Sequence, residues 1–138
     1  MWRPAETNTH QDHVIAHVIG ARALGYFVWD ETAYLLLDIG FIWNVYLDGE
    51  MGLLPHPVVS AELEADEDIK SELRSDIDSL LRQTDLETLT RLTPVTKPSP
   101  IQSVDLFESD SGHRLILNCE TSELVIETSL ESREIQIS

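Results

Sequence analysis

Short apolar runs separated by turn residues dominate residues 13–59, and they constrain the fold more than any other feature of the sequence. The runs "HVIAHVI", "ALGYFVW", "AYLLLDI" and "FIWNVYL" are rich in β-branched, aromatic and leucine side chains. Glycine or an acidic residue stands between most of them, and Asp48-Gly49 is a dipeptide typical of hairpin turns. Runs of this length between such residues favour strands over helices. We therefore predict an antiparallel meander of three or four strands whose two apolar faces are both covered.

Residues 60–92 have the pattern of helices. Five apolar residues recur at helical spacing with charged residues between them: Ile69, Leu73, Ile77, Leu80 and Leu81. Carboxylates crowd the N-terminal end of this stretch, where the helix dipole favours them, and either Ser60 or Asp66 could cap the helix. The segment from Thr84 to Glu87 has the form of a capping box. It predicts a second, short helix.

Strand-like residues return after a proline-rich connector at residues 93–100. The later runs are "IQSVDLF", "HRLILNC", "LVIET" and "REIQI". Leu115, Leu117 and Cys119 alternate with Ile116 and Asn118, which is the two-residue period of a strand. We expect Gly112 to provide the positive φ that a tight turn often needs. This part of the chain predicts a second meander.

The predicted fold class is α+β: an antiparallel β-meander, one long and one short helix, and a second β-meander. The two sets of strands could join into one curved sheet with the helices on one face. A chain of 138 residues has the size of one domain. Within a single domain 1–138 we distinguish a β-rich half (1–59), a helical segment (60–92), a Pro-rich connector (93–100) and a β-rich tail (101–138).

The charge limits the classes of partner. Twenty-five acids against nine bases give a net charge of −16, and such a field repels nucleic acid and anionic membranes. Three explanations of the acidic charge remain: plain solubility, a basic protein partner and adaptation to high salt. Our leading hypothesis is a small acidic, non-enzymatic interaction or regulatory module that binds another protein. A homodimer through an exposed strand edge is a related alternative.

Cys119 is the only cysteine, which excludes an intramolecular disulfide and a four-cysteine zinc site. The N-terminal segment "MWRPAETNTHQDH" has no apolar core of a signal peptide, and no run approaches the ~18 apolar residues of a membrane helix. We therefore expect a cytoplasmic protein. Nucleophile elbows, phosphate loops and dinucleotide fingerprints are absent, so we predict no catalytic residue.

A histidine triplet near the N-terminus is the one candidate metal site. On a helix, His10, His13 and His17 would share a face and could offer imidazole nitrogens to a divalent transition metal. On a strand His10 would point away from the other two. The H-E-x-x-H pattern is missing. Structural histidines are the favoured interpretation, and a metal-binding protein or metal-dependent enzyme is the alternative.

Aromatic side chains between residues 26 and 46 suggest a further alternative, a small-ligand carrier. Its pocket would be lined by Trp29, Tyr34, Trp43 and Tyr46. Aromatic residues at strand spacing usually form core, and that interpretation is favoured here. Asp38 interrupts an apolar run, and we interpret it as a turn residue before Gly40 rather than as a catalytic carboxylate.

Overall fold

A computed structural model describes residues 1–138 and contains two antiparallel sheets and three α-helices. The first sheet has the strand order β5-β4-β3-β2-β6 and the second has the order β1-β7-β8-β9-β10. The helices are α1 (Thr9–Val18), α2 (His56–Glu62) and α3 (Glu67–Arg82). The first-sheet strands are β2 (Ala23–Trp29), β3 (Thr32–Leu37), β4 (Phe41–Tyr46), β5 (Met51–Pro55) and β6 (Thr93–Pro94). The second-sheet strands are β1 (Arg3–Pro4), β7 (Ile101–Ser109), β8 (Gly112–Cys119), β9 (Glu123–Ser129) and β10 (Glu134–Ile137).

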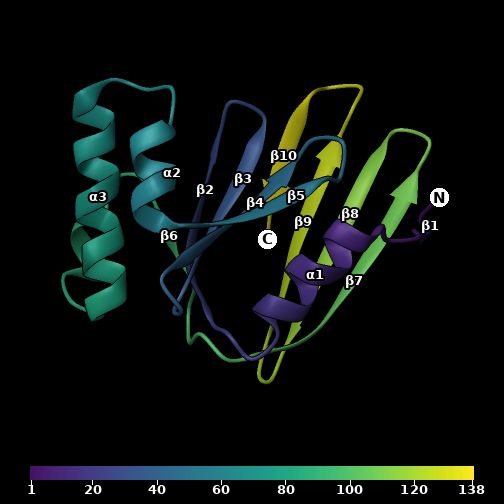
Figure 1. Ribbon diagram of the computed structural model, residues 1–138, viewed down its shortest axis with the longest axis horizontal. Helices are drawn as coiled ribbons and strands as arrows, with labels where there is room; N and C mark the ends of the chain where they lie inside the picture. The colour runs from purple at the N-terminus through teal and green to yellow at the C-terminus, as the bar shows by residue number, and fades with distance from the viewer.

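The α+β fold class and both meanders are confirmed. Figure 1 shows α2 and α3 on one side of β2–β5 and the strands β7–β10 on the other. The two sets of strands form separate sheets, so the single curved sheet does not occur. None of the helices combines the length and the apolarity needed to cross a bilayer.

The first sheet is covered on both faces, as its unbroken apolar runs predict. In β3, Leu35 and Leu37 face the second sheet, where they join a cluster with Leu115, Leu117 and other residues. Leu36 points the opposite way and packs with α2 and α3. All three leucines are at most 1% exposed, and each buried leucine contributes about 2 kcal/mol to folding.

The segment "HVIAHVI" is helical, so the strand prediction for it is wrong. Asn8 caps α1: its side chain accepts a hydrogen bond from the Gln11 amide, while the Gln11 side chain accepts one from the Asn8 amide. This reciprocal arrangement is a capping box. Gln11, Val14 and Val18 then share the buried face. Asn8 followed three residues later by Gln11 is a sequence signal for the start of a helix, and the prediction gave more weight to the apolar run after it.

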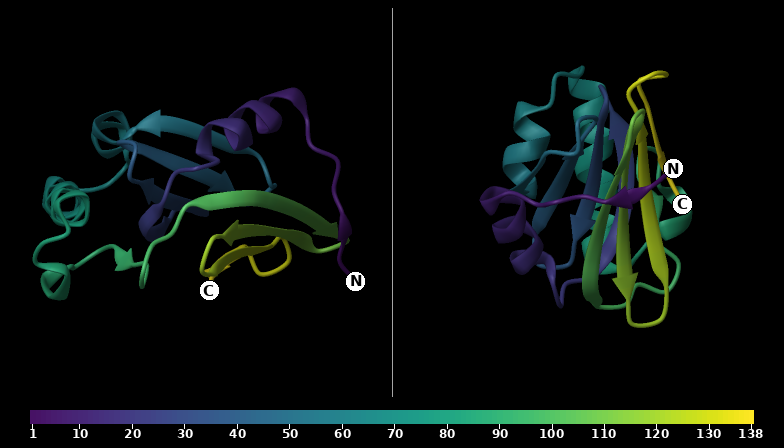
Figure 2. Two further views of the ribbon diagram at one scale, coloured as in Figure 1. Left: turned by 90° about the horizontal axis from the view of Figure 1, so that it is seen from below. Right: turned by 90° about the vertical axis from the view of Figure 1, so that its right-hand side faces the viewer.

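Helix α1 closes one flank between the two sheets (Figure 2). The Gln11 side chain donates to the Gly49 carbonyl oxygen in the β4–β5 turn. Just after the helix, the Gly20 amide donates to the carbonyl oxygen of Ile101 in β7. The helix therefore holds the edge of the first sheet against the edge of the second.

The helical segment differs from the prediction at both ends. Helix α2 was not predicted; Pro57 lies in its first turn, where proline is well tolerated. The capping-box pattern at Thr84 does not start an α-helix. Asp85 has a left-handed backbone, and only a 3₁₀ turn, Leu86–Thr88, follows. Between these regions α3 is confirmed, with Asp66 at its N-cap position.

Buried Asp76 holds the segment after this turn in place. Its carboxylate accepts hydrogen bonds from the backbone amides of Thr90, Arg91 and Leu92, at 3.0, 2.6 and 3.0 Å. Asp76 lies in α3, 14 residues before Thr90, so a contact that is distant in sequence decides the local structure. These hydrogen bonds hold residues 90–92, which bend at Thr90 and Arg91, against α3.

Two predicted turn residues have different outcomes. The turn interpretation of Asp38 is confirmed, since its carboxylate accepts a hydrogen bond from the Arg22 amide and pairs with the Arg22 guanidinium at 3.7 Å. The prediction for Gly112 is wrong, because only Gly20, Gly40 and Gly49 among the glycines have positive φ. Gly112 is required for a steric reason instead. A Cβ atom there would lie 1.9 Å from the Thr128 carbonyl oxygen.

Candidate functional site

The three candidate metal ligands lie on the outward face of α1. The ring Nε2 of His10 donates to the Met51 carbonyl oxygen at 2.9 Å, and Nδ1 of His17 donates to the His13 carbonyl oxygen at 2.7 Å. All three residues are exposed. No group of three or more His, Cys, Asp or Glu side chains is placed so that it could hold a metal ion. The structure does not assemble the triplet into a ligand group, and metal binding stays a prediction.

The four candidate aromatic residues do not line one pocket. Trp43 is fully buried between the sheets, and its indole N–H has no hydrogen-bond partner. Trp29, Tyr34 and Tyr46 lie on the opposite face of the same sheet. Tyr34 stacks on Phe27 with 4.6 Å between the ring centroids, and burial raises the pKa of its hydroxyl. Trp43 therefore belongs to the core, and ligand binding by the other three rings stays a prediction.

Every arginine is engaged by a carboxylate of the same chain. The closest of these ion pairs is Arg133–Glu31 at 2.6 Å, followed by Arg91–Glu72 at 2.7 Å. The full set adds Arg3 with Glu108 and Asp110, Arg22 with Asp38, Arg74 with Glu67, Arg82 with Asp78, and Arg114 with Glu127. Eight of the 25 carboxylates are used in this way, which leaves 17 without an ion-pair partner. Exposed pairs add little stability, but each places a carboxylate beside an arginine and so weakens the attraction of that arginine for an outside anion.

The helical layer, by which we mean α2, α3 and the turn that joins them, has a dense group of unpaired carboxylates at that turn. Between Ser60 and Thr90 there are ten acids and three bases, a net charge of −7. Four exposed carboxylates stand close together at the α2–α3 turn without any ion-pair partner: Glu62, Glu64, Asp66 and Asp68. We call these four residues the acidic turn. Lys70, the nearest lysine, donates to the Ala61 carbonyl oxygen instead.

An interhelical groove of about 310 Å³ lies between α2 and α3. Its lining comprises His56, Pro57, Ser60, Ala61, Arg74, Ile77, Asp78 and Leu81. The α3 residues follow i, i+3, i+4, i+7 spacing, so they form one stripe along the helix. Ile77 is 3% exposed and forms part of the floor, while Ala61 is open to solvent. The groove is a mainly apolar channel with charged side chains along α3.

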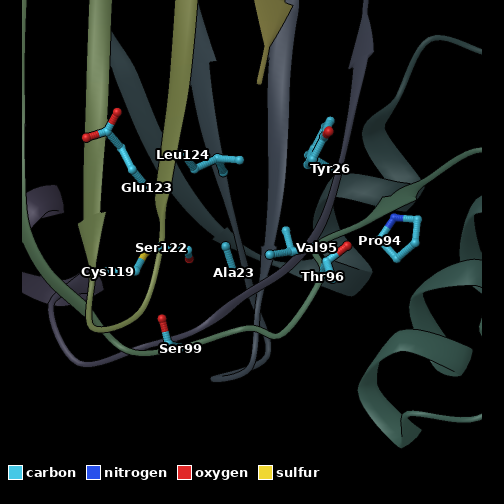
Figure 3. Close-up of a pocket in the computed structure, with 10 residues that line it drawn as sticks. All are labelled: Ala23, Tyr26, Pro94, Val95, Thr96, Ser99, Cys119, Ser122, Glu123 and Leu124. Carbon is cyan, nitrogen blue, oxygen red and sulfur yellow. The ribbon is translucent and has the colours of Figure 1, made fainter.

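A second hollow, the inter-sheet cavity, opens on the flank opposite α1 and has a volume of about 200 Å³ (Figure 3). It lies between β2 and the segment after β6 on one side and the β8–β9 turn on the other. Ala23, Val95 and Leu124 supply apolar walls, and Ser99 and Ser122 supply hydroxyl groups. A cavity of ~150 Å³ with apolar walls can bind benzene. The inter-sheet cavity therefore has room for a ligand little larger than one ring.

Cys119 also lines the inter-sheet cavity, at the C-terminal end of β8. Burial raises the pKa of its thiol, and a hydrogen bond with Ser122 lowers the pKa by a smaller amount. The thiol is therefore protonated at neutral pH and is a weak nucleophile.

Comparison of the chain with protein-family models, with curated proteins and with solved structures finds no match in any of the three. Function has to be inferred from the residues and their arrangement. Sequence reasoning identified the acidic helix but neither hollow, because α2 was not predicted and the cavity joins residues from Ala23 to Leu124. The proximity of Pro57 to a run of small and β-branched residues was the only local signal for α2.

Proposed function

We propose that this protein is a non-enzymatic interaction module whose helical layer binds a basic segment of another protein. The acidic turn carries the proposal, because four neighbouring carboxylates there form no ion pair within the chain. Carboxylates arranged in this way raise the local concentration of a basic partner and speed its association. The engagement of all arginines also argues against an anionic partner such as nucleic acid.

The proposal predicts binding that depends strongly on salt. A lysine homopeptide of about 14 residues should bind at about 20 mM NaCl, and its affinity should fall by about tenfold or more at about 300 mM NaCl, since added salt screens exposed charges. Fluorescence anisotropy of a labelled peptide measures this directly. Absence of binding at the lower salt concentration would reject the proposed function.

A charge-matched pair of variants tests whether the helical layer is the binding surface. One variant replaces the acidic turn by Glu62→Gln, Glu64→Gln, Asp66→Asn and Asp68→Asn. The control replaces four exposed carboxylates of the second sheet, which likewise have no ion-pair partner: Glu120, Glu123, Glu131 and Glu134, each by glutamine. Both variants lose the same net charge. The first should weaken peptide binding about fivefold and the control less than about twofold, whereas equal losses would point to a general field without a site.

A small-ligand carrier that uses the inter-sheet cavity is the second candidate, favoured by the apolar walls and hydroxyl groups of that hollow. Cys119 provides a reporter for it. We expect the thiol to react slowly with iodoacetamide near pH 8, because its pKa is raised, and a ligand in the cavity should slow the reaction further. A library of ring-sized neutral compounds can be screened by mass spectrometry. Unchanged alkylation rates throughout the library would count against this candidate.

A further inference from the structure

We infer that the interhelical groove is the docking site for an amphipathic basic helix of the partner, with apolar side chains of that helix seated between α2 and α3. This inference rests on the proposed function and specifies its binding surface. Apolar groups of both helices line the groove, above a floor of the almost fully buried Ile77 side chain. Ile77 lies at the bottom, Leu81 is half-buried, and Ala61 on the α2 side has only a methyl group.

The geometry of the two helices favours a helical occupant. Ala61 lies at the C-terminal end of α2 beside Lys70, whereas His56 and Pro57 lie at the other end of α2 near Leu81. The helices therefore run antiparallel, and the channel between them extends along both. A third helix can lie along such a channel with apolar residues at i, i+3, i+4 and i+7 directed into it. Val58, three residues before Ala61 and 37% exposed, extends the apolar surface on the α2 side.

Charge selects a basic partner rather than a second copy of this chain. The helical layer has eight acids and three bases, a net charge of −5, so a dimer formed through it would bring two like charges together, which is unfavourable. The charged residues inside the groove do not change this conclusion. Arg74 pairs with Glu67 at 3.5 Å, and Asp78 pairs with Arg82 at 3.1 Å, so their charges are locally balanced. The acidic turn stands unpaired at the end of the groove nearest Ala61.

Two peptides and two variants test the docking site. The first peptide is the lysine homopeptide, which carries charge alone. The second has the same length, with leucine at every third or fourth position among lysines, and can form an amphipathic helix. Ala61→Trp fills the groove without a change of charge. Ala16→Trp makes the same change at an exposed position of α1, on the other side of the molecule (Figure 1). Circular dichroism and thermal unfolding establish that both variants fold.

We expect Ala61→Trp to weaken binding of the amphipathic peptide by about tenfold, as expected for loss of a buried apolar anchor, and to change binding of the homopeptide less than about twofold. Ala16→Trp should leave both peptides within about twofold of the unmodified protein. If Ala61→Trp leaves the amphipathic peptide unaffected while both peptides still bind, the groove is not the docking site, although the proposed function stands. If neither peptide binds the unmodified protein, the proposed function itself fails.

Discussion

Gly112→Ala should destabilise the protein by about 3 kcal/mol or more, because the new methyl group has no space. Gly112 is buried in β8 opposite β9. Its Cβ would lie 1.9 Å from the Thr128 carbonyl oxygen and 3.0 Å from the carbonyl carbon. Both are backbone atoms of the paired strand, so the clash can be relieved only by separating the strands. Urea unfolding followed by tryptophan fluorescence measures the loss.

Gly52→Ala is the matched control for this substitution. Gly52 also lies in a strand, but a Cβ there would meet only the Tyr46 hydroxyl oxygen, at the ordinary distance of 3.8 Å. Its φ is not positive. Alanine at this position should change the free energy of unfolding by less than about 1 kcal/mol, with either sign. Equal effects of the two substitutions would contradict the steric argument for Gly112.

Asp76→Ala should cost about 3 to 5 kcal/mol of stability. The substitution removes the only side-chain acceptor for the amides of Thr90, Arg91 and Leu92 and leaves these donors without a partner. Leu92 is buried, so its unpaired amide alone should cost roughly 1 to 3 kcal/mol, and the exposed Thr90 and Arg91 lose hydrogen bonds to a charged acceptor as well. The segment after α3 should also loosen, which amide hydrogen exchange at residues 90–92 would detect as faster exchange.

Asp78→Ala provides the comparison within the same helix. Asp78 is two residues further along α3, is exposed, and pairs only with Arg82 at 3.1 Å. An exposed i,i+4 pair contributes roughly 0.3 to 0.5 kcal/mol. Its removal should therefore lower stability by less than about 1 kcal/mol. A loss as large as that of Asp76→Ala would mean that helix charge, rather than the buried hydrogen bonds, determines the effect.

Elements with one dominant local pattern could be predicted from the sequence. Helix α3 follows from apolar residues at three- and four-residue spacing. The four-stranded meander β2–β5 follows from its apolar runs and turn residues. Helix α1 was missed because one of the three residues on its buried face, Gln11, is polar, which weakens the helical pattern of Val14 and Val18. An isolated apolar run of this length also fits a strand equally well.

Features that depend on distant contacts could not be predicted. The turn after α3 depends on hydrogen bonds to Asp76, and the edges of β2 and β7 pair with the distant short strands β6 and β1. The candidate docking surface also depends on contacts between residues that are distant in sequence. The acidic composition of residues 60–90 can be read from the sequence. The groove cannot, because it forms only where α2 packs beside α3. The pairing of every arginine with a carboxylate cannot be read either, because pairs such as Arg133–Glu31 join residues 102 positions apart.

The order of the elements along the chain has a consequence for synthesis on the ribosome. Helix α1 can pack against β5 soon after residues 51–55 emerge, but its contact with β7 and the cover over the inner face of β2–β5 must wait until residues 101–137 are made. The helical layer emerges in the interval. A nascent chain thus displays an uncovered apolar sheet together with the eight carboxylates of the helical layer, whose mutual repulsion opposes aggregation of unfinished chains.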